Sequence, residues 1–75
     1  MEPVIGGVYR HYKGPQYRVL GLCRHSETLE ALVYYECLYA NPNGQYWVRP
    51  LAMFMGTIEQ DGQQVQRFAP VSEPG

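Results

Sequence analysis

Apolar and polar residues alternate along much of the chain in short runs, with the period of β-strands and not of helices. The run QYRVLGLCRH, residues 16–25, has an apolar centre on both of its alternating faces. The run ALVYYECLY, residues 31–39, is rich in aromatic residues, which favour strands. The pattern therefore predicts two central strands that pair antiparallel across the polar segment 24–30.

Turn-forming residues divide the rest of the chain into shorter elements. Lys-Gly-Pro at 13–15 separates a first short strand from the long run, and Asn-Pro-Asn-Gly at 41–44 precedes the strand QYWV at 45–48. The segment RPLAMFM predicts one short helical turn near residues 50–54, because proline suits the first helical position. Asp-Gly at 61–62 predicts a closing hairpin of TIEQ and QQVQRF.

These elements predict an all-β fold. Five or six short antiparallel strands in so small a domain protect their edges best by closing the sheet, so we expect a small SH3-like barrel. An OB-type barrel ranks lower because it usually needs a longer chain and a longer helix. We expect residues 1–75 to form a single domain with an ordered core from about 6 to 70. The predicted core residues are Val19, Leu20, Leu22, Val33, Tyr35, Cys37, Val48 and Leu51.

Composition and charge narrow the class of protein. The chain is 45% hydrophobic and 17% charged, with a formal net charge of -1, so it is globular and lacks the charge excess of a strong polyanion binder. It has neither a signal-peptide pattern nor an apolar stretch of about 18 residues, which predicts a cytoplasmic protein that does not enter a membrane. In that compartment Cys23 and Cys37 are expected to be reduced, and a loop centred near Glu30 would make them neighbours across the ladder.

The segment RHSETLE contains the three side-chain types of a hydrolytic triad in consecutive positions, His25, Ser26 and Glu27. Consecutive side chains of an extended segment point to opposite sides, whereas a triad must converge. The sequence therefore favours a polar turn in which Ser26 and Thr28 bind nearby backbone amides. The alternative is a small hydrolase or nucleotide-processing enzyme that uses His25 with Glu27 or Glu30.

The sequence contains neither the spacing of a structural metal site nor the motif of a phosphate-binding loop. His11, Cys23, His25 and Cys37 are zinc-compatible residue types, but their spacing provides no C-x2-4-C or H-x3-5-H pair. The turn 13–15 lacks the remaining glycines and the Lys-Ser/Thr end of a P-loop. We therefore predict no metal and no cofactor.

Basic and aromatic residues are concentrated in the first two thirds of the chain. All six Lys and Arg residues except Arg67 lie before residue 50, whereas Glu59, Asp61 and Glu73 are C-terminal. Rings stack on bases or prolines and guanidinium groups bind phosphate or carboxylate, so one face could bind RNA, a single strand or a peptide. The alternative is that the tyrosines fill the core and the arginines solvate its rim. The candidate binding residues are His11, Tyr12, Lys13, Arg24, His25, Ser26, Glu27, Trp47 and Arg49.

The segments YRHYKG, YRVLGLCRHSETLEALVYYECLY and WVRPLAMF resemble, in this order, an uncharacterised bacterial family called domain of unknown function 1653. The resemblance covers about residues 6–70. It implies a compact β-rich domain and supplies no established activity, substrate or catalytic residue. The residues that match the family pattern and could form a shared site are His11, Tyr12, Lys13, Gly14, Arg24, His25, Ser26, Glu27, Thr28, Glu30, Trp47, Arg49 and Phe54.

The sequence thus predicts a binding module for a macromolecular ligand, without catalysis of its own, that is monomeric or weakly self-associating. A small enzyme and an accessory structural subunit are the alternatives.

Overall fold

The computed structural model describes residues 2–71, and strands make up most of their regular structure. The elements of this part of the chain are β1 (Val8–His11), β2 (Gln16–Arg24), β3 (Ala31–Cys37), β4 (Tyr46–Pro50), α1 (Leu51–Phe54), β5 (Thr57–Gln60), β6 (Gln63–Gln66) and β7 (Phe68–Pro70). Within residues 2–71, no helix is long and apolar enough to cross a bilayer.

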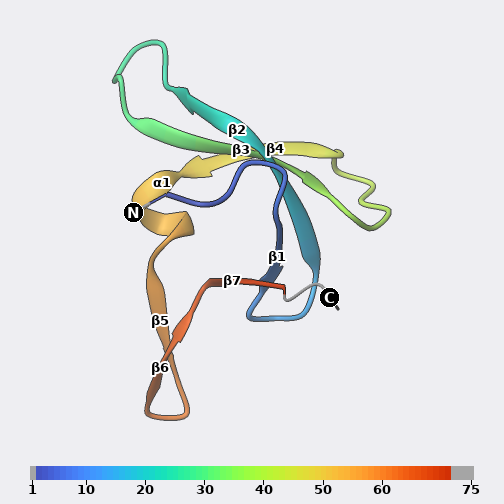
Figure 1. Cartoon of the computed structure of the whole chain (residues 1–75), viewed down its shortest axis with the longest axis vertical. Coiled ribbons are helices and arrows are strands. Elements are labelled where there is room, and N and C mark those ends of the chain that lie inside the picture. Colours follow the sequence, from blue (N-terminus) through green and yellow to red (C-terminus); the bar gives the residue numbers. More distant parts are fainter. Residues whose placement is uncertain (1, 72–75) are drawn as a thin grey trace.

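Five strands form one antiparallel sheet in the order β4-β3-β2-β1-β7, and β5 and β6 form a separate hairpin. The sheet is strongly twisted, and the hairpin extends away from it (Figure 1). Among the described residues β4 and β7 do not pair with each other, so the sheet is open and does not close into a barrel. The predicted all-β class is confirmed, whereas a closed barrel is not formed.

The C-terminal strands differ from the prediction in one respect. TIEQ and QQVQ do pair around Asp61-Gly62, whose φ angles of 52° and 79° suit a two-residue hairpin turn. The strand does not continue through Arg67, because Phe68 leaves the hairpin and pairs with His11 of β1. The ring of Phe68 is only 4% exposed there, and burying it accounts for the extra strand.

The core is aromatic and lies between the sheet and α1. Phe54, the buried residue of α1, stacks on Phe68 with ring centres 4.1 Å apart and nearly parallel planes. The buried residues of this core are Tyr9, Val19, Val33, Tyr35, Phe54 and Phe68. Four of the predicted core residues are confirmed as buried: Val19, Val33, Tyr35 and Cys37.

The other four predicted core residues are wrong or only partly right. Val48 is 52% exposed and lies opposite Tyr34 on the outer face of the sheet. Leu22 is 36% exposed, and Leu20 and Leu51 are half-buried. A β-bulge shifts the register just after Val19, so the simple alternation assumed for β2 does not continue through the strand.

The two thiols are not cross-strand neighbours, and that prediction is wrong. Cys23 pairs with Leu32, whereas Cys37 pairs with Tyr17. Both cysteines are free, Cys23 being exposed and Cys37 buried. The cause is the position of the loop, which is centred between Glu27 and Thr28 and not near Glu30, because Arg24 already pairs with Ala31.

Candidate binding site

Two groups of the predicted site residues lie at opposite ends of β2, whereas Trp47 and Arg49 lie in β4. His11, Tyr12 and Lys13 lie at the turn before this strand, and the segment 24–27 lies at the loop after it (Figure 1). Nine residues of strand span roughly 30 Å at about 3.3 Å each, so these two groups cannot share one small footprint.

The loop after β2 is a structured turn organised by His25. Its ring Nδ1 accepts the backbone N–H groups of Glu27 (3.1 Å) and Thr28 (3.3 Å), and the backbone N–H of His25 donates to the carbonyl oxygen of Glu30 (2.9 Å). The Thr28 hydroxyl accepts the N–H of Glu30 at 3.2 Å, as predicted. The bond predicted for Ser26 is replaced by those of the His25 ring, so that detail is wrong.

The side chains of this loop have structural roles. Every residue from Leu22 to Glu30 is exposed, so His25 lies in no cleft. With Nδ1 accepting two amides, the neutral ring carries its proton on Nε2 and holds the backbone together. Arg24 is used locally too, because its Nη1 donates to the carbonyl oxygen of Leu29 at 2.9 Å.

Aromatic side chains form a shallow cavity on the core-facing side of the sheet, near its β4 edge. Tyr39 and Trp47 are each 38% exposed, so their rings are accessible, and the indole N–H of Trp47 donates to the carbonyl oxygen of Gly44 at 3.0 Å. The cavity has a volume of about 220 Å³, and we call it the aromatic pocket; its lining residues are Tyr17, Tyr35, Cys37, Tyr39, Asn41, Trp47 and Arg49.

Hydrogen bonds between side chains fix the floor of the aromatic pocket. The hydroxyl oxygens of Tyr17 and Tyr39 lie 3.1 Å apart, and the Asn41 amide donates to Tyr39 (3.3 Å) and to the Cys37 sulfur (3.6 Å). Burial, and then the hydrogen bond with Tyr39, raise the pKa of Tyr17 far above its usual range. Tyr17 is therefore a neutral phenol at physiological pH.

Two basic side chains, His11 of β1 and Arg49 of β4, contact Phe68, and a third, Arg67, precedes it in the chain. The guanidinium carbon of Arg49 lies 5.3 Å from the centre of the Phe68 ring, and the His11 ring packs edge-on against it at 5.0 Å. Arg67 directly precedes Phe68, and its Nε is buried without a hydrogen-bond partner. We call His11, Arg49 and Arg67 the cationic cluster.

The charges acting on His11 are all positive. Burial first, and then the charges of Arg49, Arg67 and Lys13, lower the pKa of His11 below 6.5. The Nδ1 of His11 accepts the backbone N–H of Lys13 at 3.2 Å, so the neutral ring carries its proton on Nε2. His11 thus offers an N–H donor inside a positive environment.

The structure brings together only part of the predicted site. Trp47 and Arg49 line the aromatic pocket, and His11 meets Arg49 at Phe68. Tyr12 and Lys13 follow at the margin: the rings of His11 and Tyr12 are 4.5 Å apart, and the Lys13 ammonium lies 5.7 Å from the Tyr12 ring.

Sequence reasoning missed Tyr39 and Arg67 as site residues. The available signal for Arg67 was its position as the single Lys or Arg after residue 49, directly before an aromatic residue. In the part of the chain that the structure describes, no three His, Cys, Asp or Glu side chains are grouped to hold a metal ion.

Comparison with known proteins gives the family. A crystal structure of a DUF1653 protein from Bordetella bronchiseptica matches with a TM-score of 0.83 and 40% sequence identity, over 93% of this chain and 90% of that chain. No curated protein matches. The family described as "Protein of unknown function (DUF1653)" matches residues 7–70. The expected resemblance is confirmed, and the chain belongs to the DUF1653 family.

Proposed function

We propose that this chain is a non-catalytic module that binds single-stranded nucleic acid, RNA above all, through the aromatic pocket and the cationic cluster. The observation that carries the proposal is the position of Arg49. Its Nε lies 3.4 Å from the Tyr35 hydroxyl in the pocket, and its guanidinium lies over Phe68 in the cluster. Accessible rings stack on bases and guanidinium groups pair with phosphates, so the two features together suit a nucleotide chain.

Local charge supports this ligand although the whole chain has a net charge of -1. The acidic residues Glu59 and Asp61 belong to the β5–β6 hairpin, which extends away from the sheet (Figure 1). Glu36 follows Tyr35 in β3 and therefore points to the opposite face. Binding through two or three phosphates predicts a shallow salt dependence, with a slope of log K against log salt of roughly -1.5 to -2.

We also propose that the open sheet is a variant of the SH3-like barrel and that the protein acts in the cytoplasm as a monomer or weak homo-oligomer. A single helical turn after β4, and a last strand that returns beside β1, support the SH3-like assignment. The two free cysteines suit a reducing compartment.

The test is an NMR titration of the full chain with short oligouridylate and the matching DNA. We expect amide shifts confined to residues 11–13, 35–41 and 47–49, and their loss in Arg49→Gln with the fold intact. Arg18→Gln is the matched control, because Arg18 is an exposed arginine on the outer face, opposite Glu36.

Equal weakening by Arg18→Gln and Arg49→Gln would show non-specific attraction and refute the proposal. So would a chain that shifts only with proline-rich or acidic peptides, because the same rings and cations would then serve a peptide ligand.

A further inference from the structure

The cationic cluster contains strong hydrogen-bond donors without matching acceptors. A guanidinium has five N–H groups, yet Arg49 uses its Nε on the Tyr35 hydroxyl at 3.4 Å and its Nη1 on the Met53 sulfur at 3.5 Å, a weak acceptor. The Nε of Arg67 is buried with no partner. Buried donors are normally paired, and leaving a charged one unpaired is costly. The cluster is therefore short of acceptors.

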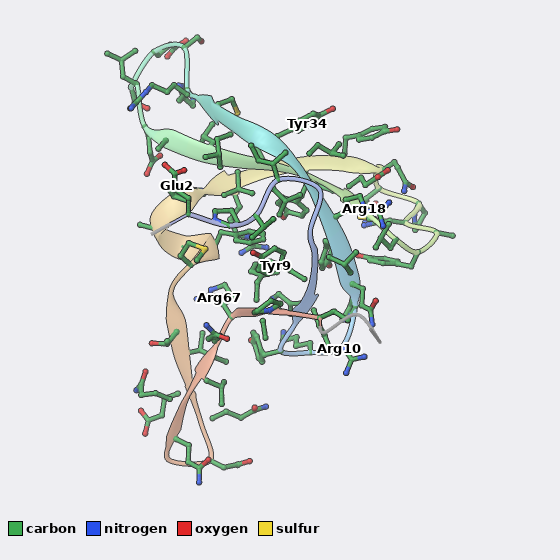
Figure 2. The ribbon with its side chains drawn as sticks, viewed as in Figure 1. Glu2, Tyr9, Arg10, Arg18, Tyr34 and Arg67 are labelled. Carbon is green, nitrogen blue, oxygen red and sulfur yellow. The ribbon has the colours of Figure 1, made fainter. Side chains whose placement is uncertain are left out.

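These donors come from segments far apart in the sequence, and the charges of Arg49 and Arg67 both act on His11. His11 comes from β1, Arg49 from β4 and Arg67 from the junction of β6 and β7; His11 and Arg49 contact the Phe68 ring, and Arg67 precedes Phe68 in the chain. Figure 2 shows Arg67 on the inner side of the ribbon, between α1 and β1, whereas Arg10 points away from it. The convergence depends on tertiary structure and is not a solvated charge run.

Within residues 2–71, the charged groups that act on His11 include no counter-charge. Arg49, Arg67 and Lys13 all act on His11, and each is positive. The aromatic pocket next to it is lined by phenols, an indole, an amide and a thiol, without a carboxylate. A bound anion would supply both the missing charge and the missing acceptors.

We propose that the cationic cluster binds one phosphate group, held by the guanidinium groups of Arg49 and Arg67 and by the Nε2–H of His11. A carboxylate offers two oxygens in one plane to a single fork, whereas a phosphate presents three or more oxygens to donors that approach from several sides. The arrangement of three donor side chains suits the phosphate. This inference rests on the proposed function, since the phosphate of a nucleotide here would direct its base toward the aromatic pocket.

Phosphate binding has a measurable effect on His11. An adjacent anion favours the imidazolium form, so the pKa of His11 must rise when phosphate binds, and phosphate must bind more tightly as pH falls. His25 lies in the loop at the far end of β2 and provides an internal reference in the same spectrum.

The experiment follows the Cε1–H resonances of both histidines against pH with inorganic phosphate, uridine 5'-monophosphate or oligouridylate, and with acetate at equal ionic strength. With each phosphate compound we expect the His11 pKa to rise by about half a unit or more while that of His25 stays constant. Arg67→Gln should weaken phosphate binding on the order of tenfold, the loss of a charge-assisted contact. Arg67→Lys should restore part of it, and the exposed neighbour Arg10→Gln should leave it unchanged.

The outcomes separate this inference from the proposed function. An equal response to acetate, or no response of His11 to any phosphate compound, would overturn the phosphate site. If oligouridylate still shifted the resonances of Tyr39 and Trp47 in that case, the proposed nucleic-acid binding would stand without the phosphate site. A His11 response to inorganic phosphate without shifts at Tyr39 and Trp47 on adding oligomers would support the phosphate site and refute the nucleic-acid function.

Discussion

Truncation of Val33 to alanine measures how much the core-facing side of the sheet stabilises the fold. Val33 is fully buried in the middle of β3, opposite Leu22 and Arg49 on the two neighbouring strands. Val33→Ala removes two methyl groups, which cost about 1.6 kcal/mol of transfer free energy at about 0.8 each. An incompletely relaxed cavity raises the expected loss to about 2 to 3 kcal/mol. That is a large fraction of the stability of a small domain, typically about 5 kcal/mol or a little more.

The assay is urea unfolding monitored by far-UV circular dichroism. The slope of the unfolding free energy against urea concentration should be unchanged, which shows that the folded and unfolded states keep their compactness. The expected loss corresponds to a fall in Tm of about 10 to 20 °C. Val48→Ala is the matched control, because Val48 is the same residue type but 52% exposed on the outer face of β4, and its truncation should cost at most about 0.5 kcal/mol. Equal losses for the two variants would show that the two faces of the sheet have been assigned incorrectly.

Three further predictions concern the loop, the thiols and pH. His25→Ala should lower the free energy of unfolding by about 0.5 to 1.5 kcal/mol, because two backbone amides lose their acceptor, whereas Ser26→Ala should cost less in the same urea assay. A thiol reagent should modify the exposed Cys23 in the native protein and reach Cys37, which is 1% exposed, only in urea; native modification of both would contradict the assigned register. The pKa of His11 is lowered in the folded chain, so the unfolded chain binds the proton first, and acidification from about pH 7.5 to 5.5 should destabilise the wild type more than His11→Gln; equal losses would contradict the burial of this ring.

Much of the secondary structure could be predicted because its signals are local. Asp61-Gly62 specifies a hairpin turn, and Pro50 directly precedes the short helix, without help from distant residues. The register of β2 on β3 could not be predicted, because it depends on a bulge after Val19 and on the ring of His25 closing the loop. The exposure of Val48 was unpredictable for a related reason, since it depends on the register of β4 on β3, which places Val48 opposite Tyr34 on the outer face.

The site residues that could be predicted are those whose side-chain type alone indicates binding. The residues that were missed join the site only through tertiary contacts. His11, Trp47 and Arg49 carry the chemistry of recognition by their side chains alone, and the structure places them on one side of the sheet. Arg24 has the same chemistry, but its guanidinium is bound to its own loop. Arg67 joins the site only because β7 pairs with β1. This contact joins segments far apart in the sequence, so no local sequence pattern predicts it.

The return of β7 to β1 has a consequence for synthesis. A chain emerging from the ribosome cannot complete its sheet until Phe68 is available to pair with His11. Strand β1 therefore stays unpaired on this side until β7 has been synthesised. The same final residues provide the ring on which Arg49 rests and the buried guanidinium of Arg67. A nascent or truncated chain ending before residue 67 would lack both a finished core and the cationic cluster. The core and the cationic cluster are therefore completed by the same two residues, Arg67 and Phe68.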